Sequence, residues 1–440
     1  MSDKTSLSAE TVKSCIVPAA ALFAAAFFVS RCLSRAGTGD AFFIAAVLSL
    51  CGLTLTFVLR RRLTPAFSAL IMLLLLARLF FFDTQTSDYT DFLHPWTEYM
   101  RAHGHFAALG ESFANYNVPY MVFLALCSCV DFFDLYLIKL LSVIFDAGLA
   151  AVLCLLTGLF SSSRVRGGLA AVLALALPTV FINGAVWGQC DGIYAFWALF
   201  ALYLCLSGHP VLSMLSLGLS FAFKLQAVFI MPAFLPMLFR GKLKLRHLPV
   251  FPAAYTAAVS PAVFAGRGIK DALLFYVSTA STAGSALNYN SPSMYSLPCF
   301  FSPADPSSAA LAGVAAAFAL CAAVFALFFI RRKKITRLSL LFAAVFFCIS
   351  IPALLPHMHE RYFYMCELLV LTAALVCPVF APAAALVQFA ALLGYYAYFK
   401  MRYLLPMRFG FAALLPVLLL SGGMLCYSLL RRREDNDRLR

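Results

Sequence analysis

The chain has 440 residues, of which 63% are hydrophobic and only 12% are charged. Soluble proteins carry roughly a quarter charged residues, so this composition excludes a soluble globular protein and predicts an all-α, polytopic membrane protein. The net charge of +14 does not indicate nucleic-acid binding, because every basic run lies at the end of an apolar segment, as in cytoplasmic loops. These runs are Arg60–Arg62, Arg164–Arg166, Arg240–Arg246, Arg331–Arg337 and Arg431–Arg433.

The order of apolar segments predicts one transmembrane domain over residues 1–440. A span needs about 20 mostly apolar residues. The candidates are 14–33, 41–59, 64–82, 135–158, 169–186, 191–207, 211–239, 247–265, 308–330, 338–356, 362–378, 382–399 and 408–430. Lys224 and Gln226 interrupt the run 211–239, which we interpret as two half-spans, giving thirteen to fourteen crossings. Both termini and all basic runs then lie in the cytoplasm.

The loops between the spans differ in size and charge. Residues 1–62 form two N-terminal spans beyond the core, residues 83–134 a large external loop with interfacial helices, and residues 266–300 a second external loop. Segment 117–134 is expected to be re-entrant or interfacial, since a crossing there would move every later basic loop outside. The acidic residues then share the external face, which predicts an external cavity: Asp83, Asp88, Asp91, Glu98, Glu111, Asp191 and Glu360.

The stretch "SDYTDFLHPWTEY" opens the first external loop. Asp88 and Asp91 are three positions apart and would share a face of a helix. They could cap an interfacial helix. Alternatively, one of them is a carboxylate base that takes a proton from a hydroxyl nucleophile at the membrane surface.

A second polar stretch, "WGQCDGIY", precedes another apolar segment. Trp187 is either a residue of the interfacial aromatic belt or a platform for a sugar ring. Gln189 and Asp191 begin a helix that faces the same cavity, where they could bind hydroxyl groups.

The stretch "LPHMHERYFY" concentrates charge at the end of a span. The His-Glu-x-x-His zinc pattern is absent, because Glu360 directly follows His359. One interpretation is a salt-bridged loop. The other is a phosphate site in which His357, His359 and Arg361 donate hydrogen bonds and Glu360 orients one donor.

Further cations lie outside the basic runs. Lys224 stands between two apolar half-helices, where it either reaches the external surface or pairs with a phosphate. Lys400, Arg402 and Arg408 fall on the external side of the predicted topology. They contact lipid head groups or a phosphorylated substrate, or the last hairpin is inverted.

Together these elements resemble the GT-C superfamily of integral-membrane glycosyltransferases. The resemblance is strongest to bacterial relatives of the second mannosyltransferase of GPI-anchor synthesis and to the dolichyl-phosphate-glucose glucosyltransferases. It covers about residues 64–364 in family order. The matching elements are Ser87-Asp88-Tyr89 with His94, Trp96 and Glu98, then Asn115–Tyr120, Phe223–Gln226 and His357–Arg361. "SDYTDF" is not a strict Asp-x-Asp, and "WGQCDGIY" is a loose match.

The resemblance implies a GT-C-like fold and an inverting hexosyltransferase. A polyprenyl-phosphate sugar, with mannose or glucose, would be the donor, and a lipid-linked or cell-envelope glycan the acceptor. Asp88 would be the general base, with Asp91 the second candidate. His357, His359, Arg361 and Lys224 would bind the donor phosphate. The remaining residues would bind substrate: Trp96, Glu98, Tyr116, Trp187, Gln189, Asp191 and Glu360.

No cofactor is required by this arrangement, no metal ligands are assigned, and an Asp/His site for a divalent metal is left open. The protein would contact membrane lipids in a bacterial cytoplasmic membrane, with the site facing outward, since the loops are short and no Asn-x-Ser/Thr sequon is present. The alternative function is a transporter or flippase for a lipid-linked or anionic solute. Transporters place charges near the midplane and often contain inverted repeats, whereas here the polar stretches gather at one face and no repeat is visible.

Overall fold

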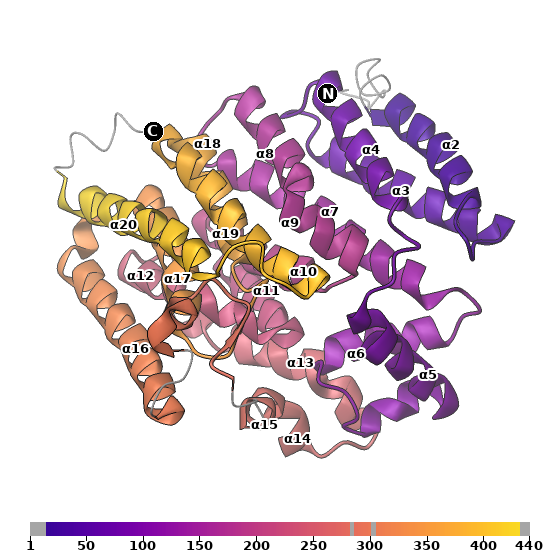
Figure 1. Ribbon diagram of the computed structural model, residues 1–440. Helices are drawn as coiled ribbons and strands as arrows, with labels where there is room; N and C mark the ends of the chain where they lie inside the picture. Colours follow the sequence, from indigo (N-terminus) through magenta and orange to yellow (C-terminus); the bar gives the residue numbers. More distant parts are fainter. Residues whose placement is uncertain (1–14, 282–285, 301–304, 432–440) are drawn as a thin grey trace. The chain divides into compact units, whose positions relative to one another are not determined.

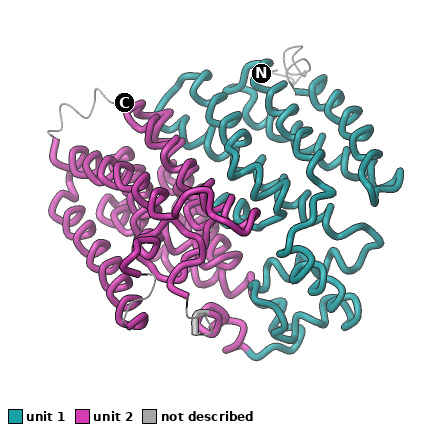
Figure 2. Tube along the Cα trace, viewed as in Figure 1, with its two compact units in different colours: residues 1–196, 260–268 teal, residues 197–259, 269–440 magenta. Residues whose placement is uncertain are grey.

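The structure is a computed structural model that describes residues 15–281, 286–300 and 305–431. Most of these residues are helical (Figure 1). Two short strands, β1 (Asn288–Tyr289) and β2 (Met358–His359), pair in parallel. The all-α prediction is therefore confirmed. The chain divides into two compact units, residues 1–196 with 260–268 and residues 197–259 with 269–440 (Figure 2).

Unit 1 is built around α7, against which α3 and α8 pack. In chain order its elements are α2 (Val17–Arg31), α3 (Thr38–Val58), α4 (Pro65–Leu79), η2 (Tyr89–Leu93), α5 (His94–Ala102), η3 (His105–Gly110), α6 (Val118–Ser128), α7 (Asp134–Thr157), α8 (Arg164–Ala176), α9 (Pro178–Phe181), η4 (Ile182–Trp187) and the start of α10 (Asp191–Leu206).

Unit 2 is centred on α17, which packs against α16, α18 and α20. Its elements after α10 are α11 (Pro210–Phe223), η5 (Leu225–Phe229), η6 (Met231–Phe234), α12 (Leu235–Phe239), η7 (Leu245–His247), most of α13 (Val250–Phe264), α14 (Ile269–Leu273), α15 (Phe275–Ser281), β1, η8 (Met294–Ser296), η9 (Pro298–Phe300), α16 (Pro306–Ile330), η10 (Arg332–Lys334), α17 (Arg337–Leu354), β2, α18 (Tyr364–Val376), η11 (Pro378–Phe380), α19 (Ala381–Lys400) and α20 (Arg408–Leu430).

Six helical segments of the described chain are long and apolar enough to cross a membrane: α3, α7, α16, α17, η11 with α19, and α20. A seventh candidate is the bent pair formed by α8 and the segment Pro178–Trp187. The remaining predicted spans fall on shorter or broken helices, among them α2, α4, α10 and α18. The protein is therefore a multi-pass helical membrane protein, and the count of thirteen to fourteen crossings stays a prediction.

Two predicted irregular segments form short helices. The run 117–134 contains only the 11-residue α6, which at 1.5 Å per residue is too short to cross the hydrocarbon core. The run 211–239 breaks at Lys224, where α11 ends in an extended backbone conformation. Its second half consists of 3-10 turns and the five-residue α12 rather than a regular half-helix.

The bend between α8 and α9 follows from a proline. Leu177 has an extended ψ of 123°, and Pro178 starts the next helix. The ring of a proline disfavours helical backbone in the preceding residue, so α8 ends here and the chain turns by 50°. This bend determines where η4 and the start of α10 lie, and both carry residues of the candidate site.

Close helix packing in unit 2 depends on Gly218 of α11. A Cβ at this position would lie 2.5 Å from the backbone oxygen of Phe251. Backbone cannot give way as a flexible side chain can, so we expect Gly218→Ala to lower the free energy of unfolding by about 1–3 kcal/mol. Thermal unfolding of the purified protein in detergent measures this effect.

Gly423→Ala is the matched control, because Gly423 lies within α20 and a Cβ there has no neighbour within 4 Å. In a helix interior, alanine is favoured over glycine by about 1 kcal/mol. The control should therefore unfold at the same or a higher temperature than the wild type. Equal stability of Gly218→Ala and the wild type would contradict the close packing of α11.

Candidate functional site

Asp88 stands at the N-terminus of η2, where two buried side chains bind its carboxylate. Oδ2 of Asp88 accepts a hydrogen bond of 3.0 Å from Nε1 of Trp187 and a second from Nε2 of Gln189. Tyr116 in turn donates to Oε1 of Gln189 over 3.0 Å. Trp187 is 1% exposed and Gln189 is 3% exposed, whereas Asp88 is half-buried. The carboxylate is therefore held in one orientation at the edge of the protein interior.

Local backbone geometry brings Trp187 and Gln189 to the same carboxylate. The π-helix η4 ends at Gly188, whose φ of 75° lies in the left-handed region that glycine adopts without strain. The turn is closed by a hydrogen bond of 2.9 Å from the Gln189 amide to the Asn183 carbonyl. Ser142 of α7 donates to the Gln189 carbonyl over 3.0 Å. This turn is therefore fixed at both ends.

The other residues predicted near Asp88 differ in their surroundings. Asp191 is fully buried at the start of α10 and accepts a hydrogen bond of 2.8 Å from Asn183 Nδ2. The Trp96 ring packs edge-on against Tyr116, with ring centroids 5.6 Å apart. Glu98 is exposed and forms an ion pair with Arg101. The structure thus groups Trp96, Tyr116, Trp187 and Gln189 with Asp88, and places Glu98 on the surface.

Asp91 does not share the environment of Asp88. It is exposed, and the Thr90 hydroxyl donates to its Oδ1 over 2.9 Å. The prediction of a common helical face assumed an α-helix, but residues 89–93 form a π-helix, whose wider turn follows an i to i+5 pattern. Of the two carboxylates, Asp88 is the one held by Trp187 of η4 and by Gln189, the residue after Gly188, which makes it the stronger candidate base.

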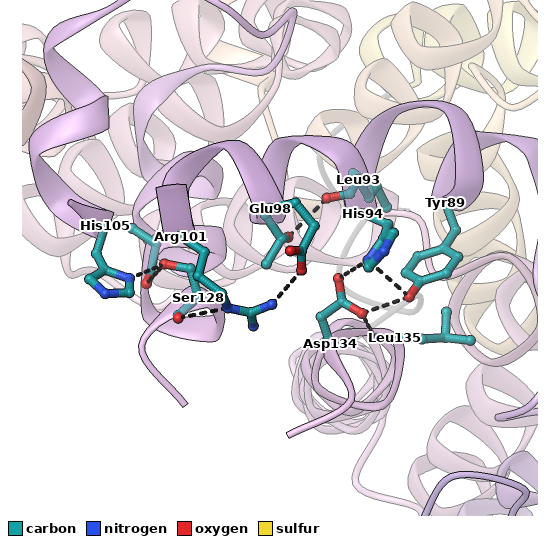
Figure 3. A network of polar contacts seen from close by, with 11 residues as sticks. Tyr89, Leu93, His94, Glu98, Arg101, His105, Ser128, Asp134 and Leu135 are labelled. Carbon is teal, nitrogen blue, oxygen red and sulfur yellow. Dashed lines mark hydrogen bonds and ion pairs between the residues drawn. The ribbon is translucent and has the colours of Figure 1, made fainter. Parts of the chain in front are cut away.

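A buried carboxylate that the sequence did not reveal anchors the same loop. Asp134 begins α7 and is 3% exposed. Its Oδ1 accepts a hydrogen bond of 2.6 Å from the Tyr89 hydroxyl, and its Oδ2 lies 2.8 Å from Nδ1 of His94 (Figure 3). Burial and the hydrogen bond to Asp134 raise the pKa of the Tyr89 phenol well above its usual value. Asp134 therefore ties η2 and α5 to α7.

The contacts continue along the far end of α5. Arg101 pairs with Glu98 and donates to the Ser128 carbonyl of α6 over 3.4 Å, and Nδ1 of His105 lies 2.8 Å from the Ser128 hydroxyl (Figure 3). Unlike Asp134, the paired Glu98 and Arg101 are exposed, and His105 is half-buried. This end of α5 therefore serves to hold the loop, and Glu98 takes part in it rather than in the group around Asp88.

Sequence reasoning also missed the charges buried within the helices of unit 1. Arg78 of α4 and Asp146 of α7 form an ion pair with 3.0 Å between Nε and Oδ2, and both side chains are almost fully buried. Lys139 of α7 donates to the carbonyls of Phe81 and Thr84, each over 2.6 Å. The available signal was the single charge, Arg78, in the apolar run 64–82 and the one charge of each sign, Lys139 and Asp146, in the run 135–158.

In unit 2, the predicted phosphate residues lie in the loop between α17 and α18. His357 has a φ of 61°, and its Nδ1 lies 2.7 Å from the Ala286 carbonyl. His359 pairs with Tyr289 in the β1–β2 ladder, and the two rings stack 4.7 Å apart. The loop is thus held against the segment 286–290 that precedes η8.

Glu360 and Arg361 form the charged centre of this loop. Nη1 of Arg361 donates to Oε1 of Glu360 over 2.5 Å, and their side chains are 13% and 2% exposed respectively. Burial raises the pKa of Glu360, but the charges of Arg361 and His359 outweigh it and leave the pKa below its ordinary value. Glu360 is therefore ionised at neutral pH and orients Arg361.

The other predicted cations are distributed along unit 2. Lys224 is 8% exposed at the end of α11. Phe229, at the end of η5, lies 6.2 Å from the ring of Tyr362, which brings the segment after Lys224 against the His357–Arg361 loop. Lys400, Arg402 and Arg408 are exposed around the start of α20. The short 3-10 helix that follows Lys224 therefore contacts the residue directly after Arg361.

The described parts of the chain hold no group of three or more His, Cys, Asp or Glu side chains arranged to bind a metal ion. All fourteen cysteines are free thiols. What the geometry offers is a fixed carboxylate among aromatic and amide groups in unit 1, and an arginine fixed by a buried glutamate in unit 2.

Fold and composition together define the class: a multi-pass, all-helical membrane protein with a polar group in each unit. No protein-family model matches the chain, and no curated protein matches it either. The side chains around Asp88 and Arg361 are therefore the basis for a more specific function.

The depressed pKa of Glu360 predicts how stability depends on pH. A carboxylate whose pKa is lower in the folded protein stabilises it above the unfolded pKa, and that contribution disappears as the pH falls through the folded value. We expect Glu360→Gln to lower the free energy of unfolding by about 1–3 kcal/mol at pH 7. The difference from the wild type should shrink as the pH falls below 4.5, the ordinary value for this group.

Thermal unfolding of both proteins between pH 7 and pH 3 tests this expectation. Glu98→Gln is the control, because the pair that Glu98 forms with Arg101 is exposed and such pairs contribute at most about 1 kcal/mol. A difference for Glu360→Gln that stays constant over the whole pH range would contradict the role of the Glu360 charge.

Proposed function

We propose that this protein is an inverting glycosyltransferase of the GT-C type. It transfers a hexose, mannose or glucose, from a polyprenyl-phosphate sugar to a lipid-linked or cell-envelope glycan. The reaction takes place on the external face of a bacterial cytoplasmic membrane, with both chain termini in the cytoplasm. One observation carries the proposal: the carboxylate of Asp88, on the loop that follows α4, is held by Trp187 and Gln189.

The surroundings of Asp88 suit a general base for a sugar hydroxyl. A base must be held within hydrogen-bonding distance of the proton that it takes, and two donors fix Oδ2 of Asp88. The nearby Trp96, Tyr116 and Trp187 combine ring faces with polar groups, as sugar recognition requires. Gln189 links Tyr116 to Asp88, so a change in any of these side chains affects the base.

The leaving phosphate requires cations, and on the family resemblance we assign this role to the loop between α17 and α18. A guanidinium binds phosphate oxygens through paired hydrogen bonds. Glu360 engages Nη1 of Arg361 and thereby limits its orientations. His357 and His359, together with Lys224, supply further donors for the charge that builds up on the phosphate as the glycosidic bond breaks.

The proposed reaction is a single displacement. Asp88 takes the proton of the acceptor hydroxyl while the acceptor oxygen attacks the anomeric carbon. The bond from that carbon to the phosphate oxygen breaks, and its electron pair stays on the phosphate, which leaves as polyprenyl phosphate. Attack opposite to the leaving group inverts the anomeric configuration. No step of this displacement needs an oxidant or a second co-reactant.

The alternative is a transporter or flippase for a lipid-linked or anionic solute. One observation favours it: several ionisable side chains are buried in the apolar helices, namely Arg78, Lys139, Asp146 and Glu367. Charges within membrane helices often mark ion or substrate pathways. Uptake of labelled sugar lipid across protein-containing liposomes, without formation of a glycosylated product, would support this alternative.

Asp88→Asn tests the base directly. Loss of a general base lowers the rate by about 10²–10⁴-fold, and asparagine preserves the shape of the side chain. We expect sugar transfer from radiolabelled polyprenyl-phosphate mannose or glucose to fall by this factor while donor binding is retained. Transfer to a membrane lipid extract by purified protein in detergent is the measurement.

Asp91→Asn is the matched control, since Asp91 lies on the same loop but is exposed and accepts a hydrogen bond from its neighbour Thr90. It should retain most of the activity. A larger loss in Asp91→Asn than in Asp88→Asn would transfer the role of base to Asp91. Undiminished transfer in both variants would refute Asp88 and Asp91 as the base.

Arg361→Gln tests the phosphate site. The variant removes the guanidinium but leaves the Glu360 backbone and the β1–β2 ladder in place. Loss of a charged hydrogen-bond donor to the developing phosphate charge should lower kcat by about 10²-fold or more. Steady-state transfer at saturating donor measures it, and Arg402→Gln, an exposed arginine, is the control. Unchanged kcat in Arg361→Gln would contradict the assignment.

A further inference from the structure

The ion pair between Arg78 and Asp146 lies directly beside the bent helix that carries the donors to Asp88. Nε of Arg78 lies 3.0 Å from Oδ2 of Asp146, and the side chains are 0% and 1% exposed. A charge in an apolar helix is costly unless it is paired and fully hydrogen-bonded.

The remaining nitrogens of Arg78 bind backbone carbonyls. Nη1 donates to Leu74 of its own helix over 2.8 Å, and Nη2 donates to Leu175 over 3.0 Å. Leu175 lies in the last turn of α8, where the carbonyls lose their helical partners because the helix ends before Pro178. The guanidinium also lies 5.1 Å from the centre of the Phe181 ring on α9. Arg78 thus contacts both sides of the bend.

Asp146 contacts the segment beyond the bend. A Cβ on Gly184 would lie 2.7 Å from Oδ2 of Asp146, so the backbone of η4 passes directly against the carboxylate. Ser142, one turn earlier on α7, donates to the Gln189 carbonyl over 3.0 Å. One face of α7 therefore holds the segment from Gly184 to Gln189 near its beginning and at its end.

We propose that Arg78 and Asp146 are positioning residues for the candidate site. Their ion pair fixes the bend between α8 and α9, and the bend places Trp187 Nε1 and Gln189 Nε2 at the carboxylate of Asp88. The catalytic consequence rests on the proposed function. The geometric consequence does not, since it concerns only the contact between Trp187 and Asp88.

The fluorescence emission of Trp187 reports directly on the contact between its indole and Asp88. The chain has three tryptophans, so a protein carrying Trp96→Phe and Trp197→Phe reports Trp187 alone. In this background, Asp88→Asn should shift the emission maximum, because it replaces a charged acceptor of the indole N–H. After Arg78→Gln is added, Asp88→Asn should no longer shift the emission, because the indole has moved away from residue 88.

Gly184→Ala is the second variant, and it decides the matter where Arg78→Gln does not fold. It keeps every charge but inserts a methyl group against the Asp146 carboxylate. It should also abolish the effect of Asp88→Asn on Trp187. Glu367→Gln is the matched control, since Glu367 of α18 is a buried carboxylate that pairs with Gln388 of α19 in unit 2. It should leave the effect of Asp88→Asn intact.

Three outcomes would overturn the inference: an emission shift that survives Arg78→Gln, a shift that survives Gly184→Ala, or no shift in the starting background. In transfer assays, Arg78→Gln should lower kcat/KM by about 10–100-fold, because Asp88 loses the donors that orient it and Trp187 moves away from the sugar. If the wild type transfers no sugar but the fluorescence behaves as expected, the proposed function fails and the positioning role stands.

Discussion

The geometry of unit 1 depends on how one guanidinium satisfies a bent helix in an apolar environment. Within a bilayer, water cannot bind the carbonyls that a broken helix exposes, so protein groups must do so. Arg78 donates to Leu175 at the break, and Asp146 neutralises its charge. Asp146 thus lies against the start of the segment that leads to the turn at Gly188, and Ser142 holds its end. The site at Asp88 is therefore a consequence of backbone hydrogen bonding as much as of side-chain chemistry.

Unit 2 uses a different device to hold charged side chains. The loop between α17 and α18 is itself not helical, and the two-residue ladder of β1 and β2 holds it in place. Gly394 of α19 lets the loop approach closely, since a Cβ there would lie 2.8 Å from Cβ of Glu360. Tyr403 donates to Asn290 Oδ1 over 2.6 Å and binds the adjoining segment. In both units, the candidate polar residues lie next to segments that are not α-helical. Hydrogen bonds hold these segments: the bond from Ser142 at the turn after Gly188, and the β1–β2 ladder at the loop between α17 and α18.

The apolar pattern of the sequence was sufficient to predict the helices. Local polar motifs identified several of the side chains that the fold then brings together around Asp88. Apolar runs specified every long helix, and the polar stretches around Asp88 and Glu360 stood out against them. The π-helix at residues 89–93 was not predictable, since no residue pattern distinguishes it from an α-helix, and so the separation of Asp88 from Asp91 was missed. Asp134 was overlooked because its partners, Tyr89 and His94, lie forty or more positions away in sequence.

The buried ion pair also bears on the choice between an enzyme and a transporter. A transporter must move helices past one another during each cycle, and every contact across the moving surface must break and form again. Arg78 engages Asp146, Leu74 and Leu175 at once, and breaking one partner from a buried pair costs about 3–5 kcal/mol. Such a multiple contact at the bend resists movement of α4 relative to α7 and α8. It therefore counts against a transport cycle in which these three helices slide past one another.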